Sequence, residues 1–231
     1  MTIKMWDLAG AEDDLRFSPF CWRIRMALAH MGLAFETVPW RFTERAAIGF
    51  SGQGLVPVIL DGEREVHDSW AIAEYLEATY AERPRLFQDE QAKALSLFFK
   101  AWCERIVHPA VLRVVIGDVF ARLREKDKAY FRESREKRFG MTLEALAAQA
   151  PQALEALRGA LDPARSVLAQ QPFVAGAAPA FADYVLFGAF QWARAVSPTR
   201  LLEAGDPLHD WRERILGLHG GLARSARGYP V

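Results

Sequence analysis

The dipeptide Ser18-Pro19 separates an apolar run at residues 3–9 from an amphipathic stretch, and it fixes where the first helix starts. Serine is a preferred N-cap because its side-chain oxygen accepts from an amide of the first turn, and proline suits the first helical position because it has no amide hydrogen. Such a helix N-terminus favours an anion, for example a thiolate held beside the serine hydroxyl. On its own, a Ser-Pro pair is most often only a helix cap.

A second motif, Val56-Pro57, opens a predicted hairpin over residues 56–67 that turns at Asp61-Gly62. Proline cannot donate to a β-ladder, so it belongs at a strand entrance, where its peptide bond is a candidate for the cis form. At this entrance Val56 can offer its backbone N–H and C=O to an extended peptide, as in β-strand addition. The sequence therefore predicts a peptide-binding edge close to the thiolate site.

A third motif, Asp68-Ser69, ends this hairpin and opens a helix over residues 70–80. The N-terminus of that helix suits a carboxylate, and the Asp68 side chain suits an amino group. Strands at residues 3–9 and 34–39 flank the first helix and form a βαβ unit. These elements predict an α+β domain at residues 1–81.

The rest of the chain reads as helical. Residues 82–89 form a polar linker broken by Pro84, and residues 90–231 carry apolar residues at helical spacing. We therefore expect a second domain that is an all-α helical bundle. Its first long helix should kink or divide at Pro109, which removes one backbone hydrogen bond.

Together the three motifs resemble those of the glutathione transferase family, in which a thioredoxin-like domain precedes an all-helical one. The resemblance implies that Ser18 contacts the glutathione sulfur, that Val56-Pro57 pairs with the cysteinyl backbone, and that Asp68-Ser69 binds the γ-glutamyl end. Residues 18–21 are also similar to the glutaredoxin motif Cys-Pro-x-Cys with serine in place of the first cysteine. We therefore expect thiolate activation, and not disulfide exchange.

Within the family, the Ser-Pro-aromatic-x-Trp and Asp-Ser-Trp patterns look most like the bacterial and fungal branch that contains the lignin β-aryl etherases. This likeness implies attack by glutathione on a hydrophobic, aromatic electrophile, with β-aryl ether cleavage as one candidate reaction. Fold and glutathione site are shared across many reactions, so the second-substrate pocket must decide the chemistry.

Two positions depart from the family pattern. Many relatives carry a basic residue for the glycyl carboxylate of glutathione just before the Val-Pro step, where this chain has Leu55. Gln53 and Arg41 are the candidates to replace it. In the second domain, Ala180 stands where relatives have a Ser or Thr cap, and loss of such a cap costs about 1 kcal/mol.

By resemblance, the second-substrate pocket lies between the Ser18 loop and the early helices of the second domain. The candidates for its lining are Phe17, Trp102, Ile106, His108 and Arg113. Core packing is the alternative role for the aromatic residues, and a solvated charge is the alternative for Arg113.

Composition narrows the remaining possibilities. The chain has 29 Lys+Arg and 29 Asp+Glu, so it has no overall positive field to attract nucleic acid or an acidic membrane. It shows no signal-peptide pattern and no membrane-spanning run, which predicts a cytoplasmic protein. The histidines lack ligand spacing, so no metal is expected. Cys21 and Cys103 should be unpaired, with Cys21 acting as a small buried apolar residue.

Three functions remain open. The first is a glutathione transferase, which the resemblance implies is a homodimer. The second is a non-catalytic binder of hydrophobic ligands on the same fold, favoured if Leu55 weakens glutathione binding. The third is a glutathione-dependent isomerase, in which the thiol adds and then leaves.

Overall fold

The computed structural model describes residues 2–230, and its N-terminal part is a four-stranded sheet with two helices. The strands are β1 (Ile3–Leu8), β2 (Phe35–Trp40), β3 (Val58–Asp61) and β4 (Arg64–His67), in the order β2-β1-β3-β4. β1 runs parallel to β2 and antiparallel to β3, and β3 pairs with β4 as a hairpin. The predicted βαβ unit and hairpin are therefore confirmed.

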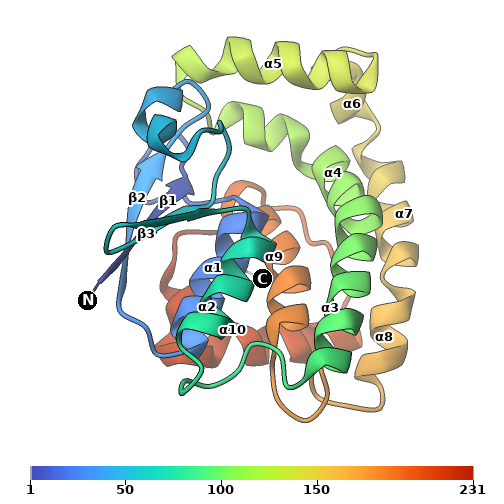
Figure 1. Cartoon of the computed structure of the whole chain (residues 1–231). Coiled ribbons are helices and arrows are strands. Elements are labelled where there is room, and N and C mark those ends of the chain that lie inside the picture. Colours follow the sequence, from blue (N-terminus) through green and yellow to red (C-terminus); the bar gives the residue numbers. More distant parts are fainter. Residues whose placement is uncertain (1, 231) are drawn as a thin grey trace.

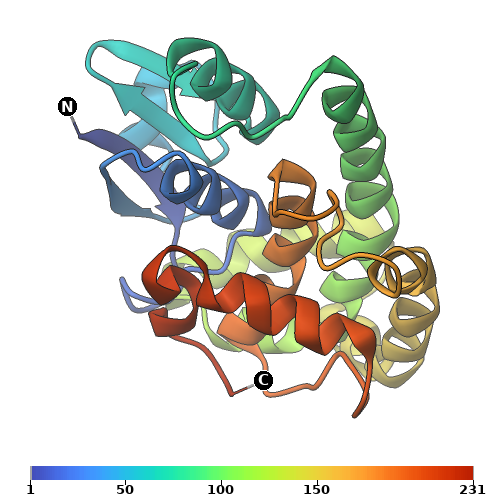
Figure 2. The ribbon, with the colours of Figure 1, turned by 90° about the horizontal axis from the view of Figure 1, so that it is seen from below.

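Helix α1 (Pro19–His30) connects β1 to β2, and helix α2 (Ser69–Thr79) follows β4. Between β2 and β3 the chain forms the short 3-10 helix η1 (Arg45–Ser51). Ile24 and Leu28 of α1 are fully buried, because this helix packs against α2 and most extensively against α9 (Phe181–Val196). Helix α1 is thus the element that joins the sheet to the rest of the molecule, as Figure 2 shows from below.

The second part of the chain is helical, as predicted. Its remaining helices are α3 (Glu90–Trp102), α4 (His108–Ala121), α5 (Glu125–Phe139), α6 (Leu143–Ala148), α7 (Ala150–Ala160), α8 (Asp162–Leu168) and α10 (Pro207–Ser225). Figure 1 shows α3 and α4 along one side of α9, with α5 crossing above the end of the sheet. Helix α9 is buried along almost its whole length and forms the centre of the bundle. None of the helices described between residues 2 and 230 is long and apolar enough to cross a membrane.

The predicted break at Pro109 takes the form of a π turn, η2 (Cys103–Val107), between α3 and α4. The N–H of His108 donates to the carbonyl of Cys103, five residues back, and Pro109 occupies the first turn of α4. Because proline has no N–H, a helix start is the position where it costs least. The wider turn places Glu104 and His108 beside the site described below.

Ala180 precedes α9 as expected and supplies no side-chain cap. Asp183 instead accepts from the backbone N–H groups of Ala180 at 3.1 Å and Val174 at 2.7 Å, and from the indole of Trp211 at 2.9 Å. Its carboxylate is fully buried, so these bonds offset the cost of removing the charge from water. Asp183 thus ties the start of α9 to its loop and to α10.

Candidate active site

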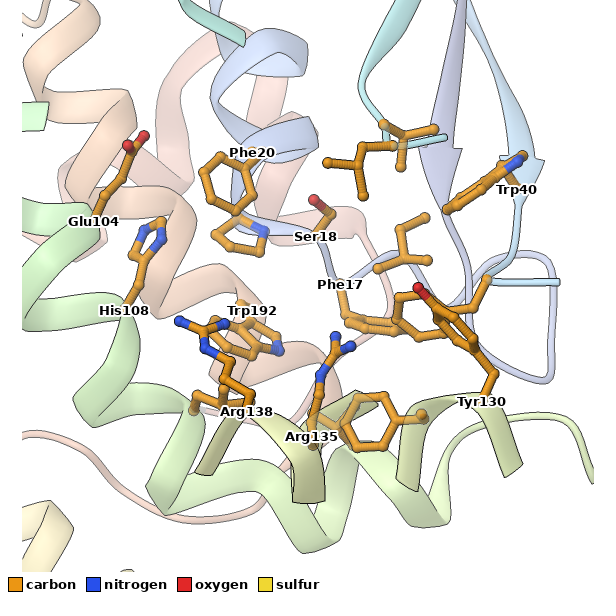
Figure 3. A pocket seen from close by; sticks show the side chains of 18 of the residues that line it. Phe17, Ser18, Phe20, Trp40, Glu104, His108, Tyr130, Arg135, Arg138 and Trp192 are labelled. Atoms are coloured by element: carbon orange, nitrogen blue, oxygen red, sulfur yellow. The ribbon is translucent and has the colours of Figure 1, made fainter. Parts of the chain in front are cut away.

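A pocket of about 250 Å³ lies where the start of α1 and the end of β2 face the helices of the second part. An apolar cavity of about 150 Å³ holds a benzene ring, so this one has room for a substituted aromatic group. Its lining residues are Leu8, Phe17, Ser18, Pro19, Phe20, Trp40, Phe42, Gly54, Leu55, Val56, Glu104, His108, Pro109, Leu112, Val119, Tyr130, Phe131, Arg135, Arg138 and Trp192. Figure 3 shows Ser18 between Phe20 on one side and Trp40 on the other.

Ser18 caps α1 as predicted. Its Oγ accepts from the N–H of Cys21 at 3.2 Å, and Pro19 occupies the first turn of the helix. This bond uses a lone pair of the oxygen, so the hydroxyl proton is left for a second partner. Ser18 is only 3% exposed yet lines the pocket. A thiolate placed here would meet both the hydroxyl and the positive end of α1.

Cys21, one turn further along, is not a second reactive thiol. Its side chain is completely buried, and burial together with the charge of Asp7 raises the pKa of this thiol well above its ordinary value. Cys103 is also buried, and both cysteines are free. The interpretation of Cys21 as a small core residue is confirmed. Position 18 is a serine, so Cys21 has no second thiol there with which to form a disulfide.

Val56 also lines the pocket, and the Val56-Pro57 peptide bond is cis. The ladder with β1 begins two residues later, where Val58 pairs with Trp6. The preceding residue, Leu55, has both backbone groups occupied, because the Gln53 amide donates to its carbonyl and accepts from its N–H, each at 2.6 Å. Gln53 therefore holds the loop, and Val56 is the last residue that lines the pocket ahead of the sheet.

Asp68 forms the N-cap of α2. Its Oδ1 accepts from the N–H groups of Trp70 at 2.9 Å and Ala71 at 3.1 Å, which leaves Oδ2 for another donor. The side chain is exposed and the backbone φ is 66°, a region that residues other than glycine rarely adopt. Strain of this kind concentrates at functional sites. Asp68 is thus presented to solvent in a conformation fixed by the helix start.

Ser69 is buried and connects to the pocket through a charged chain of contacts. Its Oγ accepts from Nη1 of Arg23 at 3.3 Å, and the same nitrogen lies 2.6 Å from Oε1 of Glu104. Lys100 donates to the other oxygen of Glu104 at 3.0 Å. Arg23 has no exposed surface, and its Nε and Nη2 have no hydrogen-bond partner in the described chain. Asp68 and Ser69 do not line the pocket themselves, but Ser69 is linked through Arg23 to Glu104, which does.

Arg41 lies away from this pocket. Its guanidinium is buried, donates to the carbonyl of Gly10 at 2.7 Å and pairs with Asp13. These contacts hold the Arg41 guanidinium within the fold. Arg45 of η1 is a cation that the sequence reasoning missed. It is exposed, its side chain lies against Gly54, and its Nη2 is 3.2 Å from the Tyr130 hydroxyl.

Two of the five candidates for the second-substrate pocket, Phe17 and His108, line the cavity. Trp102 instead packs on Phe99, with ring centroids 5.0 Å apart, Ile106 is half exposed, and Arg113 stacks over Phe139.

His108 is a buried, titratable residue of the pocket lining. Burial, with the nearby charges of Arg23 and Lys100, lowers the pKa of this imidazole well below its ordinary value, so it is neutral at physiological pH. Its Nε2 is buried and has no partner among the described residues. Its ring meets Phe20 edge-on at 5.2 Å between centroids. No group of three metal-ligating side chains occurs within residues 2–230.

Comparison with protein-family models shows which family the chain belongs to. The model of the glutathione S-transferase N-terminal domain matches residues 17–79, and the model of the C-terminal domain matches residues 94–223, which is more than half of the chain. The chain belongs to the glutathione S-transferase family. The two matches fall on the sheet part and the helical part of the fold.

Individual glutathione S-transferases agree with this membership. A probable glutathione S-transferase of rice, Oryza sativa subsp. japonica GSTU6, is 28% identical over 211 residues, which is 86% of this chain and 80% of that protein. A zeta-class glutathione S-transferase of Euphorbia esula is 39% identical over 80 residues, which is 32% of this chain and 35% of that protein.

Solved structures show the same fold over nearly the whole chain. Glutathione transferase GSTFuA3 of Phanerochaete chrysosporium has a TM-score of 0.84 and 25% identity, and the match covers 93% of this chain and 96% of that one. CsGST63524 of Ceriporiopsis subvermispora, solved in complex with glutathione, has a TM-score of 0.81 and 22% identity, with 94% and 96% covered. At 22% identity, the similarity to CsGST63524 shows that the two chains share a fold and nothing more.

Proposed function

We propose that this chain is a glutathione transferase that holds the glutathione thiolate beside Ser18 and directs it at an aromatic electrophile in the adjoining pocket. The observation that carries the proposal is the position of Ser18, whose hydroxyl is both at the N-terminus of α1 and on the wall of a largely aromatic cavity. Hydrogen bonding and the helix dipole both favour the charged form of a sulfur placed there.

The remaining parts of the tripeptide have matching groups. Val56 lines the pocket two residues ahead of the β1–β3 ladder, and its backbone N–H and C=O suit the cysteinyl residue, with Pro57 at the entrance of β3. Asp68 has a free carboxylate oxygen for the γ-glutamyl amino group, and the N-terminus of α2 at Ser69 suits its carboxylate.

For the glycyl carboxylate we propose Arg45 in place of Arg41 or Gln53. Arg41 is held by Gly10 and Asp13, and the Gln53 amide is held by Leu55. Arg45 is exposed and lies beside Gly54, next to the loop that carries Val56. A guanidinium suits a carboxylate because its N–H groups match both oxygens.

The proposed reaction is a substitution. The thiolate attacks an electrophilic carbon and forms a C–S bond, while the bond to the leaving group breaks and its electron pair departs with that group. With an aryl ether as substrate, the leaving group is a phenolate, which takes up a proton from water. The aromatic side chains of the lining accept an aromatic ring. Ser18 stays neutral and acts only as a hydrogen-bond donor.

A conjugation assay tests this proposal. The purified chain is incubated with glutathione and chlorodinitrobenzene, and in parallel with a β-aryl ether that releases a fluorescent phenol. Turnover with the first compound establishes transferase activity, and phenol release with formation of a thioether establishes ether cleavage. Glutathione binding without turnover of any electrophile would instead indicate a ligand-binding protein, and a rearranged product free of glutathione would indicate an isomerase.

We also propose a homodimer, supported by an apolar surface on α3. Leu95 and Phe98, three residues apart and therefore on one face of α3, are 70% and 74% exposed. Large apolar side chains gathered at one exposed place mark an interaction surface more often than a free one. The molar mass in solution, from light scattering, tests this directly.

A further inference from the structure

Helix α5 presents two arginines to the pocket on the side opposite α1. Arg135 and Arg138 are separated by one helical turn and both line the cavity. Figure 3 shows their guanidinium groups extending from α5 toward the space below Ser18. Like charges at this spacing on a helix repel each other, so their placement needs an explanation.

Neither arginine has an acidic partner in the part of the chain that the structure describes, residues 2–230. Arg132 on the same helix shows the contrast, because it pairs with Glu136 at 3.0 Å and with Glu144 at 2.8 Å. The one hydrogen bond that the structure gives Arg135 is to Ser134, its neighbour in the chain. A guanidinium that faces a cavity without a carboxylate is suited to receive one from a ligand.

Arg135 is held in place by aromatic rings. Its guanidinium carbon lies 4.4 Å from the ring centroid of Phe131 and 5.3 Å from that of Phe42, and both rings line the pocket. Its Nε is buried without a partner. Burial also lowers the pKa of Arg135 below the ordinary value, because its charge is incompletely hydrated. An anion at this position would restore the lost solvation.

No other lining residue neutralises these charges. Glu104 is the one carboxylate among the lining residues, and it is already paired with Arg23 at 2.6 Å and Lys100 at 3.0 Å. Trp192 lines the same pocket, and its indole Nε1, which can only donate, is buried and has no partner within the described chain. The helical wall of the pocket therefore offers donors and positive charge, while its floor is aromatic.

From this arrangement we infer that the second substrate is an aromatic electrophile bearing an anionic group, a carboxylate or a sulfonate, which Arg135 and Arg138 bind while its ring packs against the other aromatic residues of the lining. The inference rests on the proposed function and specifies the substrate of the same site. The glycyl carboxylate of glutathione is the other source of this chemistry. Arg45, beside Gly54, is better placed for that group, because it borders the loop that carries Val56.

A pair of electrophiles that differ only in charge tests the inference. Chlorodinitrobenzoate and chlorodinitrobenzamide share ring and leaving group, and each kcat/KM is divided by the uncatalysed rate constant with glutathione to remove intrinsic reactivity. We expect the wild type to prefer the benzoate, and Arg135→Gln and Arg138→Gln each to lower kcat/KM for the benzoate about tenfold, the size of one charge-assisted hydrogen bond. The benzamide should change less than about twofold.

Matched variants control for fold and for general charge. Arg135→Lys keeps the charge and should retain part of the preference. Lys137→Gln removes one charge from the same helix at an exposed position outside the pocket. It should leave kcat/KM unchanged for both the benzoate and the benzamide. Because Arg138 is exposed, its variant tests the inference even if Arg135→Gln folds poorly.

Three results would overturn the inference. Equal losses for benzoate and benzamide would mean that the arginines only shape the pocket. A raised KM for glutathione with unchanged kinetics for the benzoate would assign them to the glycyl carboxylate. If no electrophile is turned over, the proposed function fails, and calorimetric binding of naphthoate and naphthamide then decides the inference alone: equal affinity of the two ligands would refute it.

Discussion

Replacing Ser18 with alanine separates the two roles of this residue. The hydroxyl accepts from the N–H of Cys21 at 3.2 Å, and in the proposed complex it donates to the thiolate. Loss of the first bond removes a helix cap, which costs about 1 kcal/mol and lowers Tm by about 2–4 °C for a chain of this size. Loss of the second bond acts only on bound glutathione.

The magnitude of the second effect follows from the chemistry of the bond. A hydrogen bond to a charged acceptor contributes about 1.5–3 kcal/mol, and one pKa unit corresponds to about 1.4 kcal/mol. Ser18→Ala should therefore raise the pKa of the bound thiol by about one to two units, toward the free value of about 8.5. The dipole of α1 remains, and its contribution of about 0.3–1 kcal/mol keeps the pKa slightly below the free value.

The assay is the ultraviolet absorbance of the thiolate in a pH titration of the glutathione complex. Thr142→Ala is the matched control, because Thr142 caps α6 with a hydroxyl bond of the same length, 3.2 Å, outside the pocket. It should lower Tm without moving the thiol pKa. Ser18→Thr keeps the hydroxyl and should restore the wild-type pKa. A bound-thiol pKa that is identical in wild type and Ser18→Ala would refute thiolate activation by Ser18.

Further predictions concern three other places: the proposed glycyl site, the exposed surface of α3 and the buried histidine of the pocket. Arg45→Gln should raise the KM for glutathione about tenfold with little change in kcat. Unchanged glutathione kinetics in this variant would exclude Arg45 from the glycyl site. Arg41→Gln should instead lower Tm, because the Arg41 guanidinium holds the loop at Gly10. Phe98→Asp should convert the proposed dimer to monomer by light scattering, and Lys126→Asp on α5 should not; a wild-type chain that is already monomeric would contradict the assignment. Burial lowers the pKa of His108 below 6.5, so the unfolded chain binds more protons than the folded one between the lowered pKa and 6.5. The stability contribution of His108 is therefore complete above pH 6.5 and is lost on acidification. From about pH 7 to about pH 5.5 the wild type should lose more Tm than His108→Leu, and parallel curves would contradict the buried, neutral histidine.

Local sequence signals were sufficient for the elements that carry the glutathione motifs. Ser18-Pro19 starts α1, Asp68 caps α2, and the turn at Asp61-Gly62 joins β3 to β4. Each of these features depends on a hydrogen bond or a backbone restriction within a few residues, so the residue types alone predict it. The burial of the Cys21 side chain also followed from its position on the apolar stripe of α1.

The residue that would bind the glycyl carboxylate of glutathione could not be predicted from local sequence signals. Arg41 was a reasonable substitute for a missing basic residue, but a guanidinium has donors in several directions, and the sequence does not say which acceptors surround it. In the structure those acceptors are Gly10 and Asp13. Arg45 became a candidate only when η1 placed it beside Gly54.

By itself, then, the sequence determined an α+β domain followed by a helical bundle and the candidate positions for a thiolate and a peptide, because caps, turns and periodicity act locally. The tertiary structure decided which side chains line the candidate pocket. Arg135, Arg138 and Trp192 lie on helices far along the chain from Ser18, and only the packing of α5 and α9 against the start of α1 brings them to one cavity. Whether an arginine is paired or free depends on contacts between distant segments, and such contacts leave no periodic trace in the sequence.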